Sequence, residues 1–187
     1  MLLTKSLKMK KVASFILFTI LGWKLEGDFS KDVKKYVIIA APHTSWIDFP
    51  IAILARMSSG IMINFVGKSS LFKGPFGFFF RALGGTPVDR NKSNNLVDAI
   101  IETFHQKEVF RLAFSPEGTR KKVTTWKTGF YYIAKGAKVP IVMATLDFEN
   151  KKLKISEPYY ITGDKNKDFA FFKDFYSDVK GKYPELS

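Results

Sequence analysis

Short apolar runs alternate with amphipathic stretches from residue 36 onward. Five runs are rich in β-branched or aromatic residues, which is typical of buried parallel strands. The strands are predicted over residues 36–41, 61–67, 86–90, 109–115 and 139–148. Apolar residues at helical spacing predict helices over residues 47–57, 74–85, 93–107, 126–135 and about 169–179. Residues 151–157 are expected to pair with the last strand as a hairpin. Strands that alternate with helices predict an α/β fold with a mostly parallel sheet flanked by helices.

The beginning of the chain has a different pattern. The basic stretch MLLTKSLKMKK is followed by VASFILFTILGW (12–23), which carries no charge. As a helix this run spans about 18 Å, against about 30 Å of bilayer hydrocarbon, so it is too short to cross. No small-residue cleavage site follows it, which argues against a secretory signal. A core helix remains an alternative, but the lysines and Trp23 favour an N-terminal membrane-interfacial helix. We therefore expect a membrane-interfacial segment over 1–27 and one α/β domain over 28–187.

Composition narrows the chemistry. The chain has 187 residues, no cysteine and two histidines, which excludes a thiolate nucleophile and disulfides and leaves a metal site unsupported. The formal net charge is +13, which favours an anionic partner such as nucleic acid, anionic lipid or a phosphorylated substrate.

Polar residues of interest follow the predicted strands where each strand ends. His43 follows residues 36–41, Lys68 follows 61–67, Arg90 closes 86–90, and PEGTR (116–120) follows 109–115. In open parallel sheets the carboxyl ends of the strands meet at one edge, and sites form there. The sequence therefore predicts that these four segments converge.

The spacing of His43 and Asp48 constrains their geometry. On one helix, five residues turn the chain by about 140°, so the two side chains would diverge. They can meet only if His43 precedes the helix and Asp48 lies in its first turn, with Ser45 or Asp48 as the N-cap. Asp48 would then hold one imidazole nitrogen and leave the other free as a base. Alternatively, Asp48 only caps the helix and His43 is a surface turn residue.

The segment FSPEGTRKK (114–122) is the second candidate for chemistry. A turn with Pro116 and Gly118 can aim backbone N–H groups into a site, and Arg120 can bind phosphate through a bidentate fork. Glu117 is expected to stay ionised and could orient a basic side chain. A surface turn with solvated charges is the alternative, and Lys68 and Arg90 taken alone read as surface cations. The sequence contains no G-x-S-x-G, Walker or G-x-G-x-x-G motif.

In this order the motifs resemble the glycerolipid acyltransferase superfamily, in particular bacterial 1-acyl-glycerol-3-phosphate acyltransferases. The H-x4-D block matches HTSWID (43–48), and the block ending in arginine matches GGTPVDR (84–90). The E-G-T-R block matches EGTR (117–120), and the last block matches VPIV (139–142). Lys68 fits a basic residue between the first two blocks. The sequence departs from the family at Pro42, where Asn is common, and at Met143, where Pro is frequent.

The resemblance implies roles for these residues. His43 is implied as the general base and Asp48 as the group that fixes its tautomer, so that a hydroxyl attacks an acyl thioester directly. Lys68, Arg90 and Arg120 are implied to hold the phosphate of the acceptor. Glu117, Gly118 and Thr119 belong to the same binding block, with Glu117 positioning the loop and backbone N–H groups near Gly118 stabilising an oxyanion. No metal and no cofactor are expected, because acyl-carrier protein or coenzyme A brings the thioester as a co-substrate.

The expected function is acylation of 1-acyl-glycerol-3-phosphate to phosphatidic acid in phospholipid biosynthesis. We expect a peripheral or monotopic protein on the cytoplasmic face of the cell membrane. Its expected partners are the lipid surface, a lysophospholipid and an acyl donor, with no nucleic acid. One alternative is an acyltransferase for another lysolipid, such as a lyso-aminolipid, which would not need the phosphate-binding cations. Another is a non-enzymatic basic module that binds membrane or nucleic acid, whose binding would weaken steeply with salt.

Overall fold

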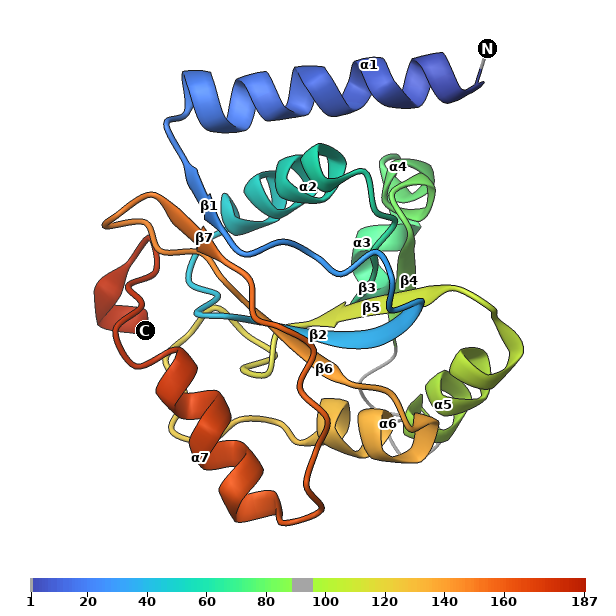
Figure 1. Ribbon diagram of the computed structural model, residues 1–187, viewed down its shortest axis with the longest axis vertical. Helices are drawn as coiled ribbons and strands as arrows, with labels where there is room; N and C mark the ends of the chain where they lie inside the picture. Colours follow the sequence, from blue (N-terminus) through green and yellow to red (C-terminus); the bar gives the residue numbers. More distant parts are fainter. Residues whose placement is uncertain (1, 89–95) are drawn as a thin grey trace.

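A five-stranded sheet forms the centre of the molecule in a computed structural model that describes residues 2–88 and 96–187 (Figure 1). Its strands are β2 (Lys35–Ala41), β3 (Asn64–Lys68), β4 (Gly85–Val88), β5 (Phe110–Phe114) and β6 (Ile141–Thr145). They are arranged in the order β4-β3-β5-β2-β6, and every neighbouring pair is parallel. The predicted α/β fold with a mostly parallel sheet is therefore confirmed.

Helices cover both faces of this sheet (Figure 1). One face carries α2 (Asp48–Ser59), together with α3 (Ser69–Lys73), α4 (Gly77–Ala82) and α1 (Leu2–Ser14), which continues as a π-helical segment, η1 (Phe15–Ile20). The other face carries α5 (Leu96–Gln106), α6 (Gly129–Ala137) and α7 (Lys165–Phe175). A separate parallel pair joins β1 (Lys24–Glu26) to β7 (Lys152–Lys154), and a short 3-10 turn spans Pro184–Leu186.

Successive side chains of β2 point to opposite faces of the sheet, and both faces are buried there. Val37 and Ile39 are fully buried in the core formed with α5, α6 and α7. Tyr36 and Ile38 point the other way, into a second buried cluster on the side of α2. Because both faces are covered, the strand reads in the sequence as a continuous apolar run.

One predicted helix is shorter in the structure. Of the helix expected over 74–85, only α4 (Gly77–Ala82) is helical, and a separate short helix, α3, ends before Gly74. A Cβ on Gly77 would lie 2.2 Å from the Phe72 carbonyl oxygen, so glycine permits this close turn. The expected hairpin of residues 151–157 with the last strand is present: Asp147 and Lys152 exchange backbone hydrogen bonds of 2.9 Å, and Ala144 and Ile155 form an antiparallel bridge. The strand β7 pairs in addition with β1, and its Leu153 is buried in the cluster that also contains Leu17 and Trp23.

The N-terminal segment packs against α2 and keeps part of its apolar surface exposed. Ala13 and Leu17 are buried, whereas Leu7, Met9, Val12 and Phe15 are each more than half exposed. Trp23 is 5% exposed, with its ring 5.1 Å from that of Phe148, so its predicted position at an interface is wrong. In the described part of the chain, no helix combines the length and the apolar character needed to span a bilayer. The interfacial role of residues 1–27 stays a prediction.

A buried carboxylate, Asp168, joins α7 to α6 and to the loop before α7. Its oxygens accept hydrogen bonds from the hydroxyls of Tyr131 (2.9 Å), Tyr159 (2.8 Å) and Thr162 (2.8 Å) and from the Thr162 N–H (3.0 Å). Burial raises the pKa of Asp168, but these hydrogen bonds outweigh it and hold the pKa below its usual value. Burial, together with the bond to Asp168, raises the pKa of Tyr131 and of Tyr159 to about 12.

Replacing Asp168 should therefore destabilise the fold in a pH-dependent way. Asp168→Asn removes the acceptor charge and should lower the free energy of unfolding by about 2–3 kcal/mol at neutral pH. Because the folded pKa is depressed, the contribution is complete above the unfolded pKa of about 3.9 and disappears as the pH falls through the folded pKa. Urea titrations from neutral to acid pH measure this difference, with the exposed Asp174→Asn on the same helix as the control. An equal loss at all pH values would contradict the assignment.

Candidate active site

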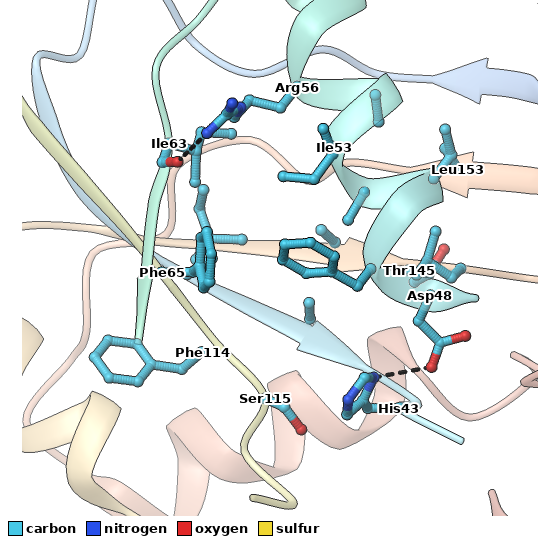
Figure 2. Close-up of a pocket in the computed structure, with 18 of the residues that line it drawn as sticks. His43, Asp48, Ile53, Arg56, Ile63, Phe65, Phe114, Ser115, Thr145 and Leu153 are labelled. Atoms are coloured by element: carbon cyan, nitrogen blue, oxygen red, sulfur yellow. Dashed lines mark hydrogen bonds and ion pairs between the residues drawn. The ribbon is translucent and has the colours of Figure 1, made fainter. Parts of the chain in front are cut away.

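His43 and Asp48 form the centre of the candidate site. His43 lies in the loop after β2, and α2 begins at Asp48, so the two side chains meet across the start of the helix. The imidazole Nδ1 lies 2.9 Å from Asp48 Oδ2 (Figure 2). The Asp48 side chain is 3% exposed, whereas that of His43 is 32% exposed. This contact uses Nδ1 and leaves Nε2 as the nitrogen that can act on a substrate.

Backbone contacts hold Asp48 in this position. Its Oδ2 also accepts the N–H of Ser45 at 2.9 Å, as the acid of a capping box does. The residue that precedes the helix is Ile47, so neither Ser45 nor Asp48 is the N-cap that the sequence suggested. A turn at residues 46–47 instead places Asp48 first in the helix, from where its carboxylate reaches back. The other oxygen, Oδ1, is buried and receives no hydrogen bond from any described residue.

Glu117 supports His43 from a distant part of the chain. Its Oε2 accepts the backbone N–H of His43 at 2.7 Å and the hydroxyl of Ser115 at 3.4 Å. Burial raises the pKa of Glu117, although the hydrogen bond from the His43 N–H acts in the opposite direction. We expected Glu117 to orient a basic side chain. In the structure it instead binds the backbone N–H of His43.

The rest of the EGTR block forms a turn. The Gly118 N–H donates to the Ser115 carbonyl at 3.1 Å, so it is not free to stabilise an oxyanion as expected. Gly118 has φ +66°, and a Cβ there would lie 2.9 Å from the Lys127 side chain, so both conformation and space favour glycine. The Thr119 hydroxyl accepts the Lys121 N–H at 3.3 Å, and Arg120 is exposed.

Two of the cations expected to hold phosphate lie among the described residues, and neither is buried. Lys68 ends β3 at the same edge of the sheet, and its side chain is exposed. Arg90 lies outside the described residues. The structure thus brings together His43, Asp48 and Glu117, while Lys68 and Arg120 lie exposed on segments that follow the strand ends.

An apolar pocket of about 230 Å³ opens beside His43, between α2 and the sheet. Figure 2 shows His43 and Asp48 at one end and Arg56 at the other, with Ile53 and Phe65 between them. The rise of α2 from Asp48 to Arg56 is about 12 Å. At the far end the buried Arg56 guanidinium donates to the carbonyls of Ile63 (3.0 Å) and Leu83 (2.5 Å), and burial lowers its pKa.

Alanines on three adjacent strands create the room for this pocket. Ala40 on β2 is in register with Ala144 on β6, and Ala113 lies on the neighbouring strand β5. Larger side chains at these positions would fill the space under α2. The sequence analysis did not single out these alanines. The feature that could have revealed them is alanine at strand positions where β-branched residues are usual.

No three His, Asp or Glu side chains within residues 2–88 and 96–187 lie close enough together to hold a metal ion.

A second cavity, of about 330 Å³, lies on the other face of the sheet. Its lining includes Pro42, Glu117, Trp126 and Tyr176.

Comparisons with known proteins bear on the family and the fold of the chain. Residues 24–147 match the sequence model of the family described as Acyltransferase. The structure is similar to the crystal structure of the 1-acyl-sn-glycerophosphate acyltransferase PlsC from Thermotoga maritima, with a TM-score of 0.61 and 20% sequence identity. That alignment covers 91% of this chain and 76% of the other chain. No curated protein sequence matches this chain. At this identity, the structural match shows a shared fold.

The contact between Glu117 and the His43 backbone predicts how the fold responds to pH. Because the folded pKa of Glu117 is raised, ionisation costs stability as the pH rises from the unfolded pKa of about 4.3 to the folded value. Wild-type protein should therefore lose stability relative to Glu117→Gln across this window. Glu117→Ala, which leaves the His43 N–H without its acceptor, should cost about 1–3 kcal/mol.

Denaturant titrations at several pH values measure both effects. The exposed Glu157→Gln serves as the matched control, since it removes the same charge without touching the histidine loop. Parallel curves for wild type and Glu117→Gln across the acid range would contradict the raised pKa.

Proposed function

The chain belongs to the acyltransferase family, and on this premise we propose that it acylates the free hydroxyl of 1-acyl-glycerol-3-phosphate with a fatty acyl group from a thioester. The observation that carries the proposal is the His43–Asp48 pair, with Nδ1 and Oδ2 2.9 Å apart at the end of an apolar pocket. The similarity in fold to PlsC, a 1-acyl-sn-glycerophosphate acyltransferase, supports this choice of acceptor.

The proposed reaction uses the two nitrogens of His43 for different tasks. Nε2 removes the proton of the glycerol hydroxyl, whose oxygen attacks the thioester carbonyl carbon. The carbon–sulfur bond then breaks, and the thiolate takes its proton from His43. Asp48 keeps the proton on Nδ1 and stabilises the imidazolium that forms. The acyl group passes directly between the two substrates, which suits a chain without cysteine.

In this proposal the apolar pocket holds the acyl chain of the donor. Its wall begins at His43 and Phe49 and continues along α2, so a chain inside it would place the thioester near Nε2. The alanines of the sheet provide the width, and Arg56 with its two carbonyl partners closes the far end. Burial of methylene groups would then contribute about 0.8 kcal/mol each to donor binding.

The acceptor's phosphate would lie outside the pocket, among the exposed cations of the sheet edge. Lys68, Arg120 and Arg90 are proposed to bind it through their positive charge. The formal net charge of +13 would draw such an anionic lipid toward the protein. A lyso-aminolipid would not use these cations, so a panel of acceptors distinguishes the two substrates.

The N-terminal segment is proposed to bring the enzyme to its lipid. Along α1, exposed apolar residues such as Leu7 and Val12 alternate with exposed Lys8 and Lys11, a pattern suited to an anionic membrane surface. The enzyme would then lie on the cytoplasmic face of the cell membrane, where acyl-carrier protein or coenzyme A delivers the donor.

Removing either member of the His43–Asp48 pair should abolish most of the activity. His43→Ala should lower kcat by about 10²–10⁴-fold, because proton removal by a positioned base is lost. Asp48→Asn should cause a loss of similar order through the wrong imidazole tautomer. The assay uses purified protein, labelled acyl-carrier-protein or coenzyme A thioesters, and a panel of lysolipids in vesicles.

The matched control is His105→Ala, which removes the only other histidine at an exposed position on α5. If no acceptor causes thioester consumption by wild-type protein, the acyltransferase proposal fails and a binding module becomes the better reading. Wild-type turnover by His43→Ala would refute the role of the pair alone.

Narrowing the pocket should change the acyl chain that is used. Ala144→Leu adds bulk beneath α2, so kcat/KM for the longest accepted acyl chains should fall about tenfold or more relative to short chains. Turnover series with donors of increasing chain length measure the shift. The control is the exposed Ala99→Leu on α5, and an unchanged chain-length profile in a folded Ala144→Leu variant would place the acyl chain elsewhere.

A further inference from the structure

Four large apolar side chains in and between α3 and α4 are exposed. They are Leu71 (48% exposed), Phe76 (67%), Phe78 (74%) and Phe79 (49%), and we call them the aromatic surface. All four lie within nine consecutive residues, which also contain the buried Phe72 (3% exposed). Exposed apolar clusters of this kind on a soluble domain mark sites of interaction.

The helices α3 and α4 are held in place by residues other than the four of the aromatic surface. Phe72 is buried, and the ring of Phe80 lies 6.0 Å from that of Phe72 and 5.8 Å from that of Phe49 on α2. Arg81 donates to the Phe72 carbonyl at 3.1 Å, which joins α4 to α3. The exposed residues therefore stand on a fixed support, and their substitution should leave the fold intact.

The charge around this surface identifies its partner. Lys68, Lys73 and Arg81 are exposed on the same short stretch, and no acidic residue occurs between Asp48 and Asp89 in the sequence. A second copy of this surface would bring like charges together, which costs free energy. An anionic bilayer offers hydrocarbon to the rings and phosphate groups to the cations, which is how aromatic and basic residues divide at a membrane interface.

We propose that the aromatic surface inserts into the interfacial region of an anionic lipid bilayer, as a membrane contact separate from residues 1–27. α1 and α4 lie on the same side of the sheet, and both pack against α2, so one bilayer can meet both (Figure 1). The aromatic surface also lies close to the pocket. The ring centroids of Phe79 and Phe80 are 5.9 Å apart, and the ring of Phe80 packs on that of Phe49, which lines the pocket. Its use in acyl transfer rests on the proposed function, whereas the contact itself does not.

Vesicle partition tests the contact directly. Phe76→Ser with Phe78→Ser should lower partition of the full chain into phosphatidylcholine vesicles containing phosphatidylglycerol by about tenfold or more, since two large apolar side chains are lost from the bilayer. The matched control is Tyr160→Ser, because Tyr160 is 65% exposed and lies outside α3 and α4. It should partition as wild type does.

A second measurement reports insertion at one position. The chain has no cysteine, so Phe78→Cys carries a single polarity-sensitive dye without background labelling. Its emission should shift to the blue on addition of anionic vesicles and should be quenched by lipids brominated on their acyl chains. The same dye at Tyr160→Cys should show neither effect. Unchanged partition of the double variant, or a dye at residue 78 that stays in water, would overturn the proposal.

Two further measurements distinguish the lipid contact from self-association and from the proposed function. Concentration-dependent self-association of wild type without lipid, abolished by the double serine variant, would assign the surface to a second copy and overturn the lipid contact. With a short-chain lysolipid dispersed in water, the double variant should turn over as wild type, while it loses activity on vesicles. Absence of turnover in every enzyme with both acceptors would sink the proposed function and leave the partition result valid.

Discussion

The carboxylate of Asp48 connects the fold to the candidate chemistry. One oxygen accepts both the backbone N–H of Ser45 and the imidazole of His43, so the start of α2 and the loop after β2 are fixed by the same atom. The partial positive charge at the beginning of a helix favours a carboxylate there. Glu117 holds the backbone of His43 from the far side of the loop, and the parallel sheet brings these segments to one edge. The imidazole is therefore oriented before any substrate arrives.

The sheet also divides the molecule by task. The face with α5, α6 and α7 contains the larger core, including the buried network around Asp168. The face with α2 contains the pocket. The same face carries α1, α3 and α4 (Figure 1). The larger core and the proposed lipid contacts thus lie on opposite sides of the sheet, and the candidate catalytic pair lies at the sheet edge.

The sequence predicted β2 and β6 well because most of their residues are buried on both faces of the sheet, which gives unbroken apolar runs in the sequence. It also predicted that His43 lies before the helix that Asp48 begins, since helical geometry allows no other way for the two to meet. It could not predict the partner of Glu117, which is the backbone of a residue 74 positions away. Trp23 was misplaced because a core and a membrane interface both accept an indole beside apolar residues.

The row of alanines beneath α2 has an energetic consequence. The pocket of about 230 Å³ is open to solvent, and its apolar lining lacks the contacts that larger strand side chains would supply. A ligand that fills the space restores the missing van der Waals contacts and, by mass action, raises the melting temperature. Under the proposed function the donor's acyl chain would be such a ligand, and the loaded protein would then unfold at a higher temperature than the empty one.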